Sequence, residues 1–211
     1  MNALDYIANK YRLDLTARSP IEISNIGRDD LARLFAELGY TRGAEIGVEQ
    51  GLYSEILCKA NPKLHLYCID AWTAYSGYRE YVTQAKIDQF YAISRERLSA
   101  YNCELIGKFS IDAVNDFKDG SLDFVFIDGN HTFMHVVQDI TLWSRKVRAG
   151  GIVSGHDYIR RRPTQTHVVE AVNGYTSSYS IHPWFLLGTR AKTLGQVRDK
   201  ARSWMWVKRH A

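Results

Sequence analysis

The sequence lacks any apolar run near the roughly 18–20 residues that a membrane-spanning helix needs. Its first residues, MNALDYIANKYRLD, place charges among the apolar positions, which argues against a secretory signal. Cysteine is scarce, and the three residues Cys58, Cys68 and Cys103 form no CxxC motif and stand in apolar runs. This usage predicts buried free thiols in a reducing compartment. We therefore expect a cytoplasmic protein without a membrane span.

Excess charge of one sign is also small. The 211 residues carry a formal net charge of +4, and most of the excess lies in IRRRP (Ile159 to Pro163) and in the segment from Arg190 onward. This distribution excludes a surface that is basic throughout, as a general nucleic-acid binder would have, and predicts one or two basic patches. The length suits one domain with a substantial core.

What is present is an alternation of strand and helix patterns. Helical spacing covers residues 29–38, 52–60, 82–98, 110–117 and a stripe from Val136 to Val147. Apolar strand patterns cover 43–48, 63–70, 103–108, 121–129 and 150–157, and SIHPWFLLGTR near the end offers one or two more. The alternation predicts an α/β fold of the Rossmann-like, doubly wound kind, with a mostly parallel sheet and helices on both faces.

Ligands of such sheets bind at the carboxyl ends of the strands. The strand ends here read EIGVEQG, CID, GKFS, FIDGNH and SGHDY. Four of these five contain an acid and two contain histidine. Such residues are poor for packing and well suited to a binding site.

The first of these ends, GAEIGVEQGLYSEIL, turns through Gly47 and Gly51 into a helical run. Dinucleotide-binding folds place GxGxxG at this turn and pyrophosphate at the helix N-terminus. The middle glycine is missing here, and Glu49 would set a negative charge beside a phosphate. Asp70, at the end of the next strand, is placed to accept the hydroxyls of a ribose. The pattern favours a cationic adenosine-like ligand that has no phosphate.

At this point the sequence resembles class I S-adenosylmethionine-dependent methyltransferases. AEIGVEQG is similar to their first motif, E/D-x-G-x-x-x-G. A strand ending in I-D-G-x-H, followed by a helix with tryptophan and G-G-I-x-x-G-H-D-Y, resembles the small-molecule and sugar O-methyltransferase branch that includes macrocin- and cephalosporin-tailoring enzymes. The resemblance covers roughly residues 29–187.

The resemblance implies a role for six residues in binding S-adenosylmethionine. Glu45, Gly47 and Gly51 would shape the methionine pocket, and Asp70 would bind the ribose. Trp72 would face the adenine, or else pack in the core. Ser110 would contact the adenine edge, or else cap the short helix that it begins.

The resemblance also implies that Asp128 lies beside the transferred methyl group. In metal-dependent members of the branch, such an acid joins an acidic pair after the fifth strand to hold magnesium. The pair here is His156 and Asp157. Histidine puts magnesium in doubt and favours either manganese or zinc, or His156 as a direct base. We expect Asp128, His156 and Asp157 to form the catalytic and metal-binding cluster, and His131 only to begin a helix.

The arginine run Arg160, Arg161 and Arg162 either lies at a solvated edge or binds an anionic acceptor at the mouth of the site. The loop AWTAYSGYREY, residues 71–81, is either a lid or a packing segment. The basic tail, with Trp204 and Trp206, would cover the core, mediate a homodimer or contact an anionic surface. We expect an N-terminal helical extension over 1–28, a methyltransferase domain over 29–189 and a tail over 190–211.

The sequence therefore predicts an O-methyltransferase for a small hydroxylated acceptor, a sugar or glycoconjugate above all. One rival is an NAD-dependent oxidoreductase, against which the absence of GxGxxG counts. A second is a cofactor-binding protein of the same fold without catalysis. A third, an RNA methyltransferase, would carry N/D-P-P-Y/F or a cysteine pair, and neither occurs. We expect a small-molecule partner and no nucleic acid.

Overall fold

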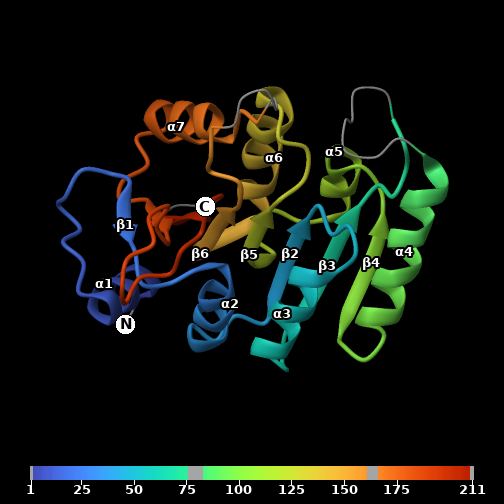
Figure 1. Cartoon of the computed structure of the whole chain (residues 1–211), viewed down its shortest axis with the longest axis horizontal. Coiled ribbons are helices and arrows are strands. Elements are labelled where there is room, and N and C mark those ends of the chain that lie inside the picture. The colour runs from blue at the N-terminus through green and yellow to red at the C-terminus, as the bar shows by residue number, and fades with distance from the viewer. Residues whose placement is uncertain (1, 76–82, 161–165, 210–211) are drawn as a thin grey trace.

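The computed structural model describes residues 2–75, 83–160 and 166–209 (Figure 1). In this part of the chain, one eight-stranded sheet runs in the order β1-β7-β8-β6-β5-β2-β3-β4. Pairing is parallel throughout, except that β8 runs antiparallel to both β6 and β7. The strands are β1 (Ile21–Ile23), β2 (Arg42–Ile46), β3 (His65–Asp70), β4 (Cys103–Gly107), β5 (Leu122–Ile127), β6 (Val147–Gly155), β7 (Phe185–Leu187) and β8 (Trp204–Val207).

Helices cover both faces of this sheet, which confirms the predicted fold class (Figure 1). One apolar cluster joins the first four helices to one face, and a second joins the last three to the other. The first four are α1 (Ala3–Tyr11), α2 (Arg28–Glu37), α3 (Leu52–Ala60) and α4 (Gln84–Leu98). The last three are α5 (Ser110–Ala113), which continues into the short 3-10 helix Val114–Asp116, α6 (Phe133–Lys146) and α7 (Val168–Ser178).

Strand β5 shows why the sequence folds into these layers. Its residues LDFVFI are almost all apolar, and successive side chains of a strand point to opposite faces. Phe124 and Phe126 therefore enter the cluster beneath α1–α4, whereas Val125 and Ile127 enter the cluster beneath α5–α7. A strand that packs against helices on both sides needs this nearly continuous apolar pattern.

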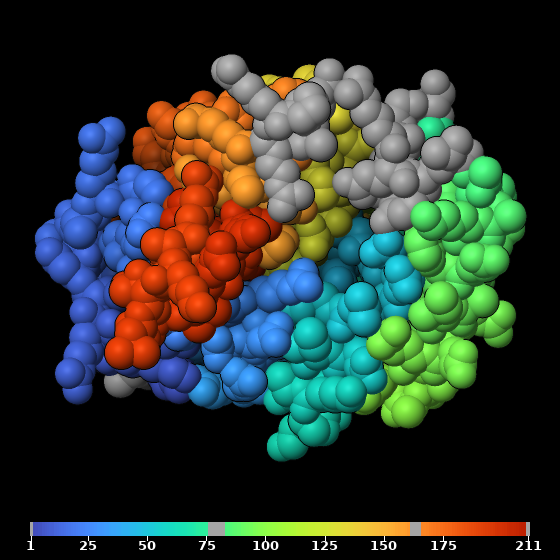
Figure 2. All heavy atoms as spheres, viewed as in Figure 1, coloured from blue at the N-terminus to red at the C-terminus, as the bar shows by residue number. Residues whose placement is uncertain are grey.

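The segments expected to flank the domain both contribute to the sheet. β1, from the predicted extension 1–28, pairs with β7, and β8, from the predicted tail, lies between β7 and β6. Trp204 and Trp206 are buried, which agrees with the expectation that they cover the core. In Figure 2 the red C-terminal segment lies against the blue N-terminal segment at one end of the molecule. An ion pair of 2.7 Å between Arg202 and Glu22 joins the two segments.

No helix in the described ranges combines the length and the apolar character needed to cross a membrane. The aromatic loop predicted over residues 71–81 lies only partly in the described structure, up to Tyr75.

The sheet edge that carries the site is formed by the carboxyl ends of β3, β2, β5 and β6, which run parallel to one another. In the strand order β6-β5-β2-β3, the end of β2 lies between the ends of β5 and β3, and the end of β6 lies next to that of β5.

Candidate functional site

The turn after β2 depends on its two glycines. Gly47 has φ +89°, and a Cβ atom there would lie 2.3 Å from the backbone oxygen of Asp128, so no side chain fits. Gly51 has φ +74° and is the N-cap of α3. The glycine turn therefore passes directly beside the end of β5 and leaves the N-terminus of α3 facing the same edge.

Asp70, at the end of β3, fixes this turn from the neighbouring strand. One carboxylate oxygen accepts hydrogen bonds from the backbone N–H groups of Val48 (3.0 Å) and Glu49 (2.9 Å). The other accepts from the backbone N–H of Trp72 at 3.0 Å. Asp70, the residue predicted to bind the ribose, thus also holds the glycine turn in shape. Oδ1, which accepts one hydrogen bond, retains a lone pair for a ligand.

Glu45 is a buried acid beneath the glycine turn, only 2% exposed. The hydroxyl of Ser54, on α3, donates a hydrogen bond to its carboxyl group. Burial raises the pKa of Glu45 to about 8, although the hydrogen bond from Ser54 acts in the opposite direction. The carboxyl group is therefore largely protonated at neutral pH in the protein without a ligand.

A cavity of about 440 Å³ opens at this edge of the sheet. Its volume lies in the range of small-molecule sites. All six residues expected to bind the cofactor are within it or at its boundary: the lining includes Glu45, Gly47, Asp70, Trp72 and Ser110, while Gly51 begins α3 next to lining residue Leu52. The structure thus brings the predicted cofactor residues to one place.

Trp72 lies at one wall of the cavity and is 8% exposed. Its ring N–H donates to the backbone oxygen of Glu49 at 2.9 Å, and its ring lies 4.8 Å from that of Tyr91. Its φ of 41° is in the left-handed region, where a bulky residue is unusual. The side chain therefore both packs in the core and contributes a wall of the cavity.

Ser110 begins α5, and its hydroxyl donates to a carboxylate oxygen of Asp139, on α6, at 2.5 Å. The residue before it, Phe109, is the N-cap, so the alternative in which Ser110 caps this helix is not what the structure shows. Asp139 was not singled out in the sequence, because it falls in the apolar stripe of α6. An acid at a position where the helical period calls for an apolar residue was the signal that could have found it.

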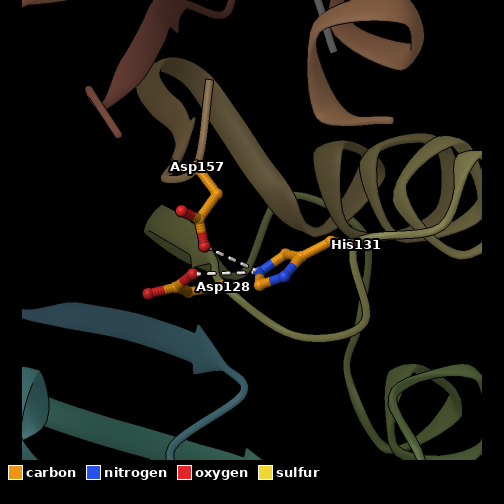
Figure 3. A group of neighbouring side chains, drawn as sticks. All are labelled: Asp128, His131 and Asp157. Atoms are coloured by element: carbon orange, nitrogen blue, oxygen red, sulfur yellow. Dashed lines mark hydrogen bonds and ion pairs between the residues drawn. The ribbon is translucent and has the colours of Figure 1, made fainter. Parts of the chain in front are cut away.

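Asp128, His131 and Asp157 meet at the other end of the cavity (Figure 3). His131 Nε2 lies 3.1 Å from a carboxylate oxygen of Asp157 and 3.4 Å from one of Asp128. Each residue offers a ligand atom within 4.8 Å of the others, and each side chain is about one-fifth exposed. Two carboxylates and one imidazole form a donor set that can hold a divalent ion.

The electrostatic surroundings of Asp128 keep it ionised. Burial acts to raise its pKa, but the hydrogen bond from His131 and the nearby charges outweigh burial, so that the pKa lies below its usual value. Among these charges is Arg28, at the start of α2, whose guanidinium lies 3.9 Å from the carboxylate and over the ring of Tyr53. Sequence patterns gave no signal for Arg28, because it precedes the first motif by 17 positions.

His156 lies beside this cluster but is not part of it. Its Nε2 is 3.4 Å from a carboxylate oxygen of Asp199, and it is not among the residues that line the cavity. Burial lowers its pKa, but the hydrogen bond to Asp199 and the carboxylates of Asp128 and Asp157 outweigh burial and raise it. His156 Nδ1 lies 3.8 Å from a carboxylate oxygen of Asp157, but the opposite ring nitrogen contacts Asp199, and the ring does not join Asp128 and Asp157 in the group of potential metal ligands. His131 takes the place in the cluster that the sequence assigned to His156.

Of the arginine run, only Arg160 belongs to the described residues; Arg161 and Arg162 lie outside them. Arg160 forms an ion pair of 2.8 Å with Glu170, on α7, and its side chain is 69% exposed. It does not line the cavity. Its proposed contact with an acceptor stays a prediction.

Residues 44–158 match the sequence profile of a family described as "Methyltransferase domain". No curated protein matches the chain at a significant level. Several solved structures share its fold. The O-methyltransferase TomG from Streptomyces achromogenes, which is involved in tomaymycin synthesis and was solved in complex with S-adenosylmethionine, is 19% identical, with 98% of this chain and 89% of that chain covered and a TM-score of 0.58.

An O-methyltransferase from Bacillus cereus in complex with S-adenosylhomocysteine is 15% identical, with 98% of this chain and 89% of that chain covered and a TM-score of 0.59. The O-methyltransferase NovP is 16% identical, with 87% and 80% covered and a TM-score of 0.58. These identities establish a shared fold. The matched profile spans more than half of the chain and contains the glycine turn, Asp70 and the acids at the ends of β5 and β6. The chain therefore belongs to this methyltransferase family, which confirms the predicted enzyme class.

Proposed function

We propose that the protein transfers a methyl group from S-adenosylmethionine to a hydroxyl oxygen of a small acceptor, a sugar or glycoconjugate. The observation that carries the proposal is the position of Asp128, His131 and Asp157 at one end of the cavity whose other walls are the glycine turn, Asp70 and Ser110. This arrangement would place a methyl donor and a cluster able to activate an acceptor next to each other.

The glycine turn and its surroundings fit the cofactor. Gly47 leaves open the space that a side chain would fill, which allows a ligand to approach the backbone. Glu45 is buried in the lining with no ion pair among the described residues, and a cationic ligand would supply the missing partner. S-Adenosylmethionine carries both an ammonium and a sulfonium group. Its donor carbon is already activated, so the protein needs chiefly to align the two reactants and exclude water.

The cluster fits a divalent ion that accepts both carboxylate and imidazole ligands. Carboxylates are the ligands that magnesium and manganese prefer, whereas an imidazole ligand favours manganese or zinc. When bound, such an ion would lower the pKa of an acceptor hydroxyl. Asp128 and Asp157 would hold and orient it, while His131 would complete the set from the start of α6. If no ion binds, His131 is the group placed to accept the proton directly.

The sugar or glycoconjugate acceptor is the finer part of the proposal. It is supported by the resemblance of the strand ends FIDGNH and SGHDY to the sugar O-methyltransferase branch. The three solved structures named above are all O-methyltransferases, which agrees with a hydroxylated acceptor. Membership of a methyltransferase family gives no support to the NAD-dependent alternative.

A panel of hydroxylated acceptors with S-adenosylmethionine labelled in its methyl group tests the proposal. Sugars, glycoconjugates and phenols are compared by mass spectrometry of the products. A mass gain of one methyl group on the oxygen of a sugar is the expected result. Methylation of phenols alone would overturn the acceptor assignment. Tight binding of the cofactor with no turnover on any acceptor would favour the non-catalytic alternative.

A further inference from the structure

Asp139 is a buried acid on α6 that packing does not require. It is 4% exposed, and its neighbours along the inner face of α6 are the apolar residues Val136, Ile140 and Trp143. In the described structure its side chain takes part in no ion pair and accepts a single hydrogen bond, from Ser110. Burial raises its pKa to about 6. A carboxyl group in such a place costs stability unless its remaining oxygen has a partner.

The carboxyl group of Asp139 lies at the cavity, where a ligand could be the partner of the remaining oxygen. Asp139 and Ser110 both line it, and Oδ1 receives the hydrogen bond from Ser110. The second oxygen, Oδ2, lies on the side of Gly129, where a Cβ atom would be 3.8 Å away. The serine hydroxyl thus fixes the orientation of the carboxyl group and leaves one acceptor oxygen unused by the protein.

The position along the cavity indicates which part of the cofactor meets this oxygen. With the methionine part at the glycine turn and the ribose at Asp70, the heterocycle extends toward the ends of β3 and β4. Ser110 follows β4, and its bond to Asp139 closes this end of the cavity from the side of α5 and α6. The adenine ring carries its exocyclic amino group, a hydrogen-bond donor, on the edge far from the ribose.

We propose that Asp139 determines the choice of purine: its free carboxyl oxygen accepts a hydrogen bond from the 6-amino group of adenine, while Ser110 holds the carboxyl group in place. The inference rests on the placement of the cofactor proposed above. It makes the site selective for a 6-amino purine, because a 6-oxo purine would present a second acceptor to the same oxygen. Two facing acceptors without a donor leave both groups unsatisfied.

The test compares S-adenosylhomocysteine with S-inosylhomocysteine, its 6-oxo analogue, by isothermal titration calorimetry. The wild-type protein should prefer the adenosyl compound by about tenfold or more, the usual effect of one hydrogen bond to a charged or buried group. In Asp139→Asn the amide oxygen can still accept from Ser110, so the amide NH2 group faces the cavity. The preference should then fall by about tenfold or more and move toward the inosyl compound.

Asp119→Asn is the matched control, because Asp119 is an exposed acid that pairs with Arg145 and Lys146 away from the cavity. Its ratio of affinities should equal that of the wild type. Equal affinity of the wild type for the two compounds would overturn the inference. An equal loss of affinity for both compounds in Asp139→Asn would also overturn it, because such a loss indicates a structural role. If Asp139→Asn does not fold, Ser110→Ala replaces it and should reduce the ratio; an unchanged ratio overturns the inference. Failure of the folded wild type to bind S-adenosylhomocysteine would instead refute the cofactor placement.

Discussion

The imidazole Nε2 of His131 lies 3.1 Å from a carboxylate oxygen of Asp157, so the start of α6 and the end of β6 meet through one nitrogen. The same nitrogen faces Asp128 at 3.4 Å. With a proton on Nε2, the imidazole can donate a hydrogen bond to either carboxylate. A divalent ion would require the neutral imidazole and would take over the same three ligand atoms.

Metal binding should therefore depend on His131 and not on His156. Titration of the purified protein with Mn²⁺, followed by electron paramagnetic resonance, should show a site that weakens at least about tenfold in His131→Ala and in Asp157→Ala. His156→Ala should keep the site, because its imidazole faces Asp199. A chelator should abolish turnover, and added Mn²⁺ should restore it. Equal Mn²⁺ affinity in wild type and Asp157→Ala would show that the cluster is not a metal site.

Asp70→Ala should weaken the binding of S-adenosylhomocysteine by about 1–3 kcal/mol, the effect of losing a charge-assisted hydrogen-bonding partner. The change should also lower the free energy of unfolding, because two N–H groups of the glycine turn lose their acceptor. Calorimetry and urea denaturation measure the two effects. Asp116→Ala is the control, since this acid pairs with Lys108 at the surface and is half-exposed. Unaltered affinity in Asp70→Ala would refute the assigned role in binding the ribose.

Gly47→Ala should abolish cofactor binding and destabilise the fold. The added Cβ would lie 2.3 Å from the backbone oxygen of Asp128, and a φ of +89° is strained for alanine. Gly174→Ala is the matched control, because Gly174 lies within α7 with no atom within 4 Å of an added Cβ. This control should gain about 0.5–1 kcal/mol, the difference in helix propensity. Thermal denaturation of both variants checks the contrast, and similar stabilities would contradict it.

Stability should fall with rising pH because of Glu45. Its pKa is about 8 in the folded protein and near 4.5 when exposed, so the folded state retains a proton that the unfolded state releases between these values. The contribution is fully present below pH 4.5 and is lost as pH rises through about 8. In Glu45→Gln this loss should vanish. The difference in free energy of unfolding between the two proteins should therefore change with pH by a few kcal/mol, on the order of 1.4 per pKa unit. Parallel denaturation curves from pH 5 to pH 8 would contradict the prediction.

The sequence predicts the central elements closely and the flanking ones poorly. The helix expected over 52–60 is α3, with the same bounds, and the glycine turn before it lies where the motif predicts. These elements have strong local signals, namely helical spacing and two glycines at positive φ. β1 and β8 have three and four residues, too few for a period to be visible, and exist because of pairing with distant strands. The helix α7 follows the arginine run and was not predicted at all.

In the site, too, residues within local motifs are predictable, whereas residues placed by long-range contacts are not. Motifs locate Asp128 and Asp157, because both end apolar strands. They do not distinguish His131 from His156, since this choice depends on which imidazole the folded chain brings within reach of both carboxylates. Arg28 and Asp139 enter the site from helices, through contacts with residues far away in the chain. No single stretch of sequence contains those contacts.

The insertion of β8 between β6 and β7 has a consequence for the order of folding. β1 and β7 pair with each other, and within the described residues the sheet continues from them to the other strands through residues 204–207. A two-stranded ribbon alone is marginally stable in water. The edge that contains β1 must therefore wait for a segment more than 180 positions later in the chain, and contacts of such long range are slow to form. We expect the part from β2 to β6, which carries the cofactor residues, to become protected against hydrogen exchange before β1 does.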